Sequence, residues 1–366
     1  MSSKKDNINT VDINFLRQAL NLAIENDGLT GQNPSVGCLI TSNNKIISQG
    51  VTSVNGRPHA EFNALNKIKK KTKKSTMYVT MEPCDHFGKT PPCTDIIIKS
   101  NISRVVYGVE DIDKRTYFKA CSKLRSEGIK VKRSVNKKEI TNFYKKYFFC
   151  KKNNMPYVTG KIACSKDNFI YSKNKKYITN EYSLDVSHLL RYKNEGILVS
   201  YKTLNKDNPY LTCRLNGLEK FSPKRFIIDK NLKSKKNLNI FKDKNKNKTY
   251  IFHDSNNFKK INFFKKRKIK LIKIKSKNNK IDFFLILSRI YKLNISRLLV
   301  EGGRKLTDNF IKNRLFNEFY LFKSSKSLKN SGSINIKDTI KKISLNFKNN
   351  NLLDTYTEED KITKYF

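Results

Sequence analysis

Residues 58–61 read Pro-His-Ala-Glu, and residues 80–93 read Thr-Met-Glu-Pro-Cys-Asp-His-Phe-Gly-Lys-Thr-Pro-Pro-Cys. Together they supply one imidazole, His59, and two thiols, Cys84 and Cys93. One imidazole and two thiolates suit zinc, and three protein ligands leave a fourth position for water. Because these ligands stand at the starts of successive expected helices, the two stretches predict a zinc site built on an α/β framework.

Glu61 is the expected catalytic residue. It follows His59 by two residues at a helix start, where its carboxylate can reach a zinc-bound water without being a ligand. Zinc lowers the pKa of its water toward neutrality, and zinc nucleobase deaminases use a glutamate in this position to move protons. We assign Glu61 this role from that pattern. His86 is an alternative ligand, although we expect it to line the substrate mouth, and we expect Cys38 to pack in the core.

The sequence around these motifs predicts strands that alternate with helices. Apolar residues at three-to-four spacing indicate helices, and short apolar runs bounded by turn residues indicate strands. The expected helices span residues 12–25, 59–69 and 117–126, with another beginning near 92, and the expected strands span 36–41, 45–49, 76–80, 104–109 and 129–132. The first two strands are joined by a turn through residues 42–44. Such alternation indicates an α/β layered structure.

A domain boundary is expected where the pattern resets, at Lys-Lys-Asn-Asn-Met-Pro in residues 151–156. A chain of 366 residues commonly holds two domains. We therefore place one domain, which carries the zinc motifs, at 1–150 and a second α/β domain at 151–366. In the second domain the expected strands span 157–163, 196–200, 225–229, 268–275 and 297–300, and the expected helices span 181–191, 281–293 and 306–311. Residues 231–280 are rich in Lys and Asn, and we expect parts of them to be solvated loops.

Composition gives the chain a formal net charge of +45, from 76 basic and 31 acidic residues. The excess is spread along the chain, is mostly Lys, and comes with abundant Asn, Ile and Phe, which favours A/T-rich coding over a dedicated site for a polyanion. Seven widely scattered cysteines and no secretory signal argue against disulfides and favour a cytoplasmic, reducing location. No stretch approaches the roughly 18 uninterrupted apolar residues of a membrane span.

The motifs resemble those of the bifunctional deaminase–reductase family of riboflavin biosynthesis. Besides residues 58–61 and 80–93, the resemblance rests on Asn-Pro-Ser-Val-Gly-Cys at 33–38. The eight residues between Cys84 and Cys93, with their Gly-Lys-Thr-Pro-Pro, separate this family from cytidine, adenosine and deoxycytidylate deaminases. The family usually has Ser and Arg where Asp85 and Lys89 stand. The resemblance implies a cytidine-deaminase-like three-layer domain that removes the 2-amino group of 2,5-diamino-6-(5-phosphoribosylamino)pyrimidin-4-one.

The second half resembles the family's reductase domain, which has a dihydrofolate-reductase-like fold and uses NADPH. Lys-Ile-Ala-Cys-Ser-Lys-Asp at 161–167 and Leu-Val-Glu-Gly-Gly-Arg-Lys-Leu at 299–306 carry the resemblance, which extends over roughly residues 10 to 320. Hydride would pass to the ribose C1 of the deaminated product and open the sugar to ribityl. The family differs at three positions, with Gly, Trp and Ser where this chain has Asn168, Tyr177 and Lys230.

The resemblance also implies the ligand contacts of both domains. The residues implied for NADPH are Ala163, Tyr177, Thr203, Asp207, Gly303, Arg304, Lys305 and Leu306, and those implied for substrate are Asn33, Arg191, Leu211, Arg214 and Glu301. Glycines between a strand and a helix let phosphate approach backbone N–H groups. Arg191 and Arg214 would offer planar forks to the substrate phosphate. Asn33 would hydrogen-bond the pyrimidine ring.

Three other functions remain as alternatives. The basic charge favours a nucleic-acid-editing zinc deaminase, but the long Cys84–Cys93 loop and the reductase-like half oppose it. A deaminase with a degenerate reductase domain would explain the departures at residues 168, 177 and 230. A binding protein built on an inactive deaminase is opposed by the retention of Glu61 with all three ligands. We expect a small phosphoribosyl pyrimidine as partner, with no specific nucleic acid and no membrane, and homo-oligomerisation is left open.

Overall fold

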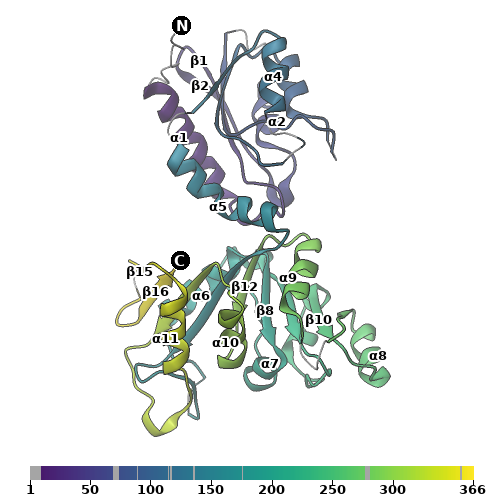
Figure 1. Ribbon diagram of the computed structural model, residues 1–366, viewed down its shortest axis with the longest axis vertical. Helices are drawn as coiled ribbons and strands as arrows, with labels where there is room; N and C mark the ends of the chain where they lie inside the picture. Colours follow the sequence, from purple (N-terminus) through teal and green to yellow (C-terminus); the bar gives the residue numbers. More distant parts are fainter. Residues whose placement is uncertain are drawn as a thin grey trace. The chain divides into compact units, whose positions relative to one another are not determined.

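The computed structural model describes residues 10–68, 74–88, 90–113, 115, 118–134, 137–174, 176–276, 281–354 and 357–366 (Figure 1). The chain divides into two compact units, Met1–Asn154 and Met155–Phe366. The boundary expected at 150/151 falls inside helix α5 (Lys137–Asn153), which the sequence analysis did not predict. The division lies after this helix because α5 packs on the sheet of the first unit, where Ile140 and Tyr144 join the core.

The first unit is a five-stranded sheet between two layers of helices. Its elements are α1 (Thr10–Glu25), β1 (Gly37–Ser42), β2 (Lys45–Val51), α2 (Ala60–Leu65), β3 (Thr76–Met81), α3 (Cys93–Lys99), β4 (Arg104–Val109), α4 (Lys119–Ser126), β5 (Lys130–Arg133) and α5. The strand order is β2-β1-β3-β4-β5. β1 is antiparallel to β2 and β3, whereas β3, β4 and β5 are parallel. Figure 1 shows α1 and α5 on one face of the sheet and α2 and α4 on the other.

Local sequence explains the hairpin and the close packing of α1. Asn43 and Asn44 have φ of 47° and 58°, and asparagine tolerates this left-handed conformation in two-residue hairpin turns. Gly37 is required for a different reason. A Cβ at this position would lie 1.8 Å from the carbonyl oxygen of Ala19, so only glycine lets α1 pack so close to β1.

The second unit is built on a nine-stranded sheet in the order β11-β10-β9-β8-β12-β6-β13-β16-β15. The strands of this unit are β6 (Tyr157–Cys164), β7 (Phe169–Ser172), β8 (Gly196–Ser200), β9 (Lys224–Ile228), β10 (Thr249–His253), β11 (Lys270–Lys273), β12 (Arg297–Glu301), β13 (Glu318–Lys323), β14 (Gly332–Asn335), β15 (Asn350–Leu352) and β16 (Lys361–Tyr365). β7 and β14 pair in a separate two-stranded antiparallel sheet. The helices of this unit are α6 (Glu181–Tyr192), α7 (Tyr201–Asp207), α8 (Phe258–Lys266), α9 (Phe283–Lys292), α10 (Arg304–Lys312) and α11 (Lys337–Asn346). The sheet is parallel from β11 to β13, and β16 and β15 add an antiparallel edge.

The Lys/Asn-rich stretch at 231–280 holds more regular structure than its composition suggests. It contains β10, α8 and β11, and every residue of β10 is buried. Tyr250, Ile251 and Phe252 supply the apolar run of this strand, and Phe264 of α8 is fully buried beside it. The many lysines around this short apolar run make the average composition of the stretch polar. Their side chains stay at the surface, so they do not prevent the strand between them from being buried.

The α/β class predicted for both halves is confirmed by this architecture. The parallel strands of the second unit place their carboxyl ends at one edge of the sheet, where the glycine pair of residues 302–303 follows β12. Within the described residues, no helix combines the length and the apolar character needed to cross a bilayer.

Candidate active sites

The three predicted zinc ligands converge in the first unit. His59 directly precedes α2, Cys93 is the first residue of α3, and Cys84 follows the end of β3. His59 Nδ1 lies 3.5 Å from Cys84 Sγ and 3.4 Å from Cys93 Sγ, and the backbone N–H of Cys93 donates to Cys84 Sγ at 3.4 Å. All three ligand atoms lie within 4.8 Å of one another.

These distances fit a tetrahedral zinc ion. With Zn–S of about 2.3 Å and Zn–N of about 2.0–2.1 Å, tetrahedral angles put sulfur and nitrogen about 3.5 Å apart. The observed separations of 3.4 and 3.5 Å from the imidazole nitrogen match that value. The donor set is therefore suited to zinc in both type and spacing. His86 is not one of the three residues whose ligand atoms converge, and Cys38 is fully buried in β1.

The surroundings of Cys84 and Glu61 shift the pKa values of both groups in directions that suit a metal site. The hydrogen bond from Cys93, helped by His59, lowers the pKa of the Cys84 thiol to about 4, so this sulfur ionises readily. Glu61 lies in the first turn of α2 and is only 4% exposed. Burial raises its pKa despite the nearby His59, and its carboxyl also contacts the Cys93 thiol. A buried carboxyl beside the ligands is suited to carrying protons.

Asn33 lies in the loop before β1. Its side-chain amide donates to the carbonyl oxygen of Gly56 at 2.9 Å, in the short 3-10 helix Val54–Gly56 that precedes His59. The amide nitrogen thus ties the 33–38 loop to the segment that carries the histidine ligand.

In the second unit, most of the residues implied for the cofactor lie near the carboxyl ends of β6, β8 and β12. Gly303 caps α10, whose first turn contains Arg304, Lys305 and Leu306, and Thr203 lies in the first turn of α7. A Cβ at Gly303 would lie 4.0 Å from Thr203 Oγ1 and 3.7 Å from the Tyr171 hydroxyl. Glycine at this position therefore keeps an open backbone surface beside two hydroxyl groups.

Tyr171 was not singled out from the sequence, yet it joins two of the implied cofactor residues. Its hydroxyl interacts with the side chains of Thr203 and Asp207, and Lys206 Nζ lies 3.5 Å from its ring centroid. Burial raises the pKa of Asp207 to about 6. No local pattern marks Tyr171, because β7 is a short strand of half-buried residues.

Arg191 differs from the expectation for a phosphate ligand. Its Nε and Nη2 donate to the two carboxylate oxygens of Glu301, each at 2.8 Å, and Nη1 donates to the carbonyl oxygen of Thr212 at 3.2 Å. The side chains of Arg191 and Glu301 are only 12% and 14% exposed. A carboxylate this deeply buried needs a cation beside it. The guanidinium N–H groups of Arg191 that could bind a phosphate therefore bind Glu301.

Lys161 adds a second, half-buried cation that was not predicted from the sequence. It lies in β6 one residue before Ile162, and its ammonium stands 4.7 Å from the ring centroid of Phe322. Burial lowers the pKa of Lys161 against the opposing charge of Glu301. A lysine in an otherwise apolar strand is the signal that could have revealed it. Ala163, two residues later and half-buried, belongs to the same strand.

Arg214 and Leu211 occupy contrasting environments. The Arg214 side chain is exposed, while its backbone N–H donates to His188 Nδ1 at 3.3 Å. Burial lowers the pKa of His188 to about 4, which keeps this ring neutral, and its Nδ1 also lies 3.1 Å from the carbonyl oxygen of Thr212. Leu211 is 2% exposed and packs in a hydrophobic cluster with φ of 57°, so only its backbone could meet a ligand.

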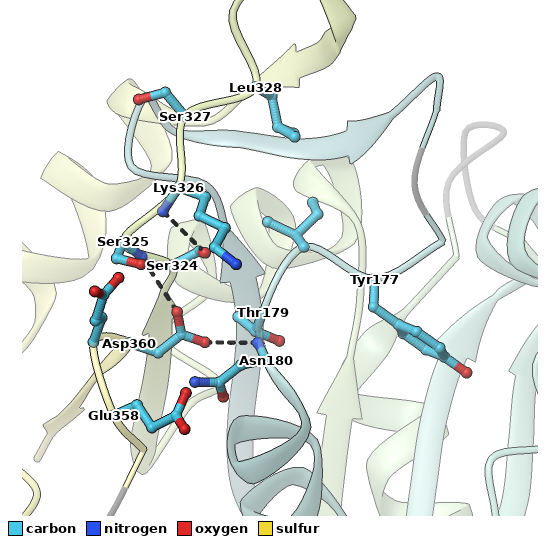
Figure 2. A pocket seen from close by; sticks show the side chains of 12 residues that line it. Tyr177, Thr179, Asn180, Ser324, Ser325, Lys326, Ser327, Leu328, Glu358 and Asp360 are labelled. Atoms are coloured by element: carbon cyan, nitrogen blue, oxygen red, sulfur yellow. Dashed lines mark hydrogen bonds between the residues drawn. The ribbon is translucent and has the colours of Figure 1, made fainter.

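Tyr177 lines a pocket of about 150 Å³ beside the carboxyl end of β13. Figure 2 shows its ring pointing away from the cluster formed by Ser325, Lys326 and Asp360. The Asp360 carboxylate accepts from the backbone N–H groups of Asn180 and Ser325, at 2.9 and 3.2 Å. This pocket therefore joins the segment after β7, the segment after β13 and the segment before β16.

Comparisons with known proteins match both halves. A family model described as "RibD C-terminal domain" matches residues 156–348, and one described as "Cytidine and deoxycytidylate deaminase zinc-binding region" matches residues 9–109. The chain is 34% identical over 317 residues to the riboflavin biosynthesis protein RibD of Aquifex aeolicus, covering 86% of this chain and 87% of that protein. RibD of Buchnera aphidicola is 32% identical over 335 residues, 87% and 88% of the two chains.

Solved structures of related proteins have the same fold over nearly the whole chain. A Thermotoga maritima diaminohydroxyphosphoribosylaminopyrimidine deaminase/5-amino-6-(5-phosphoribosylamino)uracil reductase superimposes with a TM-score of 0.80 at 28% identity, covering 97% of this chain and 98% of that one. Acinetobacter baumannii RibD has the same fold, with a TM-score of 0.83 at 22% identity and the same coverage. The chain therefore belongs to the RibD family of riboflavin biosynthesis proteins, with a zinc-binding deaminase domain followed by an NADPH-dependent reductase domain.

Proposed function

We propose that this chain deaminates 2,5-diamino-6-(5-phosphoribosylamino)pyrimidin-4-one and then reduces the ribosyl group of the product. The convergence of His59, Cys84 and Cys93 beside the buried carboxyl of Glu61 is the observation that carries the first step. The name of the Thermotoga maritima relative, which states both reactions, supports the substrate.

In the deamination, zinc held by these three ligands would supply a Lewis acid that activates water. Glu61 would take a proton from that water and deliver it to the ring nitrogen as the C–O bond forms. It would then carry a second proton, from the hydroxyl added to the ring carbon, to the amine as the C–N bond breaks. Its burial supports this role, because a carboxyl whose pKa is raised binds a proton more readily near neutral pH. Asn33 remains a proposed contact to the ring through its amide oxygen, since its nitrogen donates to Gly56.

In the reduction, NADPH would supply hydride to the ribose C1, and the ring oxygen would take a proton as the sugar opens. The open backbone at Gly303, beside Thr203 and Tyr171, supports binding of the cofactor's phosphates at the start of α10. The Arg191–Glu301 pair with Lys161 supports a substrate site at the ends of β6 and β12. Arg214, with its exposed side chain, is the better candidate for the substrate phosphate.

One experiment tests both steps. The purified chain is incubated with the pyrimidine substrate, with and without NADPH, and product mass and released ammonia are measured. Glu61→Gln should keep zinc and lose at least about 100-fold in deamination rate, as removal of a general acid–base group does. NADPH-dependent reduction of the deaminated intermediate by the same variant is the internal control.

Two results would contradict the proposal. Undiminished deamination by Glu61→Gln would reject the proton-transfer role. Failure to bind NADPH at millimolar concentration would reject the reductase assignment and favour a degenerate second domain. A nucleic-acid-editing function is disfavoured because the reductase-domain match covers residues 156–348. We also propose a cytoplasmic location, which the thiol ligands support because they must stay reduced to bind metal.

A further inference from the structure

Lys123 of α4 lies between two carboxylates that flank the cysteine ligands. Its Nζ lies 3.0 Å from Asp85 Oδ1 and 2.6 Å from Asp95 Oδ1. Asp85 follows Cys84 directly, and Asp95 is two residues beyond Cys93. One ammonium group therefore joins the two segments that must bring their sulfurs to the same ion.

Further hydrogen bonds make Asp85 the centre of this contact. Thr94 Oγ1 donates to Asp85 Oδ1 at 2.6 Å, and the backbone N–H of Thr94 donates to the carbonyl oxygen of Cys84 at 3.2 Å. The side chain of Asp85 is only 15% exposed. Without Lys123, two carboxylates would stand close together beside two thiolates, and their mutual repulsion would push the segments apart.

Helix α4, which carries Lys123, is anchored in the hydrophobic core. Ala120 and Leu124, on either side of Lys123 in the helix, are 1% and 0% exposed, so the helix is held by the core. The backbone N–H of Phe118, just before α4, also donates to Glu82 Oε2 at 3.3 Å. The helix thus contacts the metal-binding segment on both sides of Cys84.

We propose that Lys123 is a positioning residue of the zinc site. By holding Asp85 and Asp95 together, its ammonium keeps the sulfurs of Cys84 and Cys93 at zinc-binding separation across the long loop that joins them. The inference rests on the proposed deaminase function for its activity readout, but not for its metal readouts.

The expected effect is moderate. Residues that orient metal ligands typically contribute about 10- to 100-fold in metal affinity. The Lys123 side chain is 37% exposed, and solvent screens such contacts, so we expect about a 5-fold faster release of zinc when the ammonium is removed. A distorted ligand set should lower kcat for deamination more than it changes KM, since the lysine is not proposed to touch substrate.

The test uses the full chain with Lys123→Met, and Lys119→Met as matched control, because Lys119 is exposed on the same helix. Zinc transfer to a chromogenic chelator gives the release rate, and the thiolate-to-metal absorption of the cobalt-substituted protein reports ligand geometry. Lys123→Met should release zinc faster and alter the cobalt spectrum. Lys119→Met should match the parent, and Lys123→Arg should restore both readouts.

A double variant separates charge from packing. Adding Asp85→Ser to Lys123→Met removes the carboxylate left without its cation, and should recover part of the lost zinc retention. Parental zinc release and cobalt spectrum in Lys123→Met would overturn the inference. So would a loss that Lys123→Arg fails to restore although circular dichroism and NADPH-dependent reduction remain parental. If the parent binds zinc but does not deaminate, the proposed function fails while the metal readouts still decide the role of Lys123.

Discussion

Replacing Glu301 with glutamine should destabilise the second unit by about 3 kcal/mol at pH 7. Burial opposes ionisation of this carboxyl, but the charge and hydrogen bonds of Arg191, with the charge of Lys161, outweigh it and hold the pKa of Glu301 at about 2, against an ordinary value of 4.5. Lowering a pKa by one corresponds to about 1.4 kcal/mol, so the difference between 4.5 and about 2 amounts to about 3 kcal/mol. The side chain is only 14% exposed, so solvent screening reduces this value little.

The pH dependence has a definite sign. A carboxyl whose pKa is lower in the folded state stabilises that state fully above its unfolded value, and the contribution is lost as pH falls through the folded value. The stability gap between parent and Glu301→Gln should therefore be constant above about pH 4.5 and should shrink between that pH and about 2. Glutamine does not titrate, so the change in the gap belongs to Glu301.

Urea unfolding at pH 7 and at about pH 3.5 measures this gap. Circular dichroism is the suitable probe, because the chain contains no Trp. Hydrogen exchange read by mass spectrometry assigns the transition to residues 155–366. Glu219→Gln is the control, since Glu219 is exposed on the surface and should change stability by less than about 0.5 kcal/mol. An unchanged unfolding midpoint in Glu301→Gln, or a stability gap that widens as pH falls, would show that the ionised Glu301 does not stabilise the second unit.

Three further predictions concern the rest of the chain. Tyr144→Phe removes a buried hydroxyl that donates to the Ser35 carbonyl oxygen at 3.0 Å and lies 2.6 Å from Thr80 Oγ1, and calorimetry should show the first unit less stable by about 1–3 kcal/mol. Asp243→Ala leaves Arg225, which is fully buried, without its carboxylate, and urea titration should show a loss of about 3–5 kcal/mol that Arg225→Met partly reverses. Zinc removal by a chelator should abolish ammonia release while NADPH-dependent reduction by the same sample persists, because the ligand cluster lies wholly in the first unit. A parallel loss of both activities would argue against independent sites.

The zinc ligands could be predicted from the sequence because zinc coordination accepts only a few types of side chain. Few combinations of imidazole and thiol at helix starts suit anything but a metal. Most strands were also predicted, since a buried strand needs an apolar run of its own, as in residues 104–109 and 196–200. Helix α5 was not predicted. Its buried Tyr144 contacts Ser35 and Thr80, which precede it in the chain by 109 and 64 positions.

Local composition and spacing were enough to predict the α/β class, the metal-binding residue types and the division into two parts. They could not predict which charged side chains pair with one another, because those pairs form between distant segments. Arg191 pairs with Glu301 across 110 positions, and Lys123 reaches Asp85 across 38. Pairings of this kind depend on strand order and helix placement, which bring distant segments to one sheet edge or one loop. The sequence near a charged residue therefore does not indicate which residue it pairs with, and its role can be assigned only when the folded structure is known.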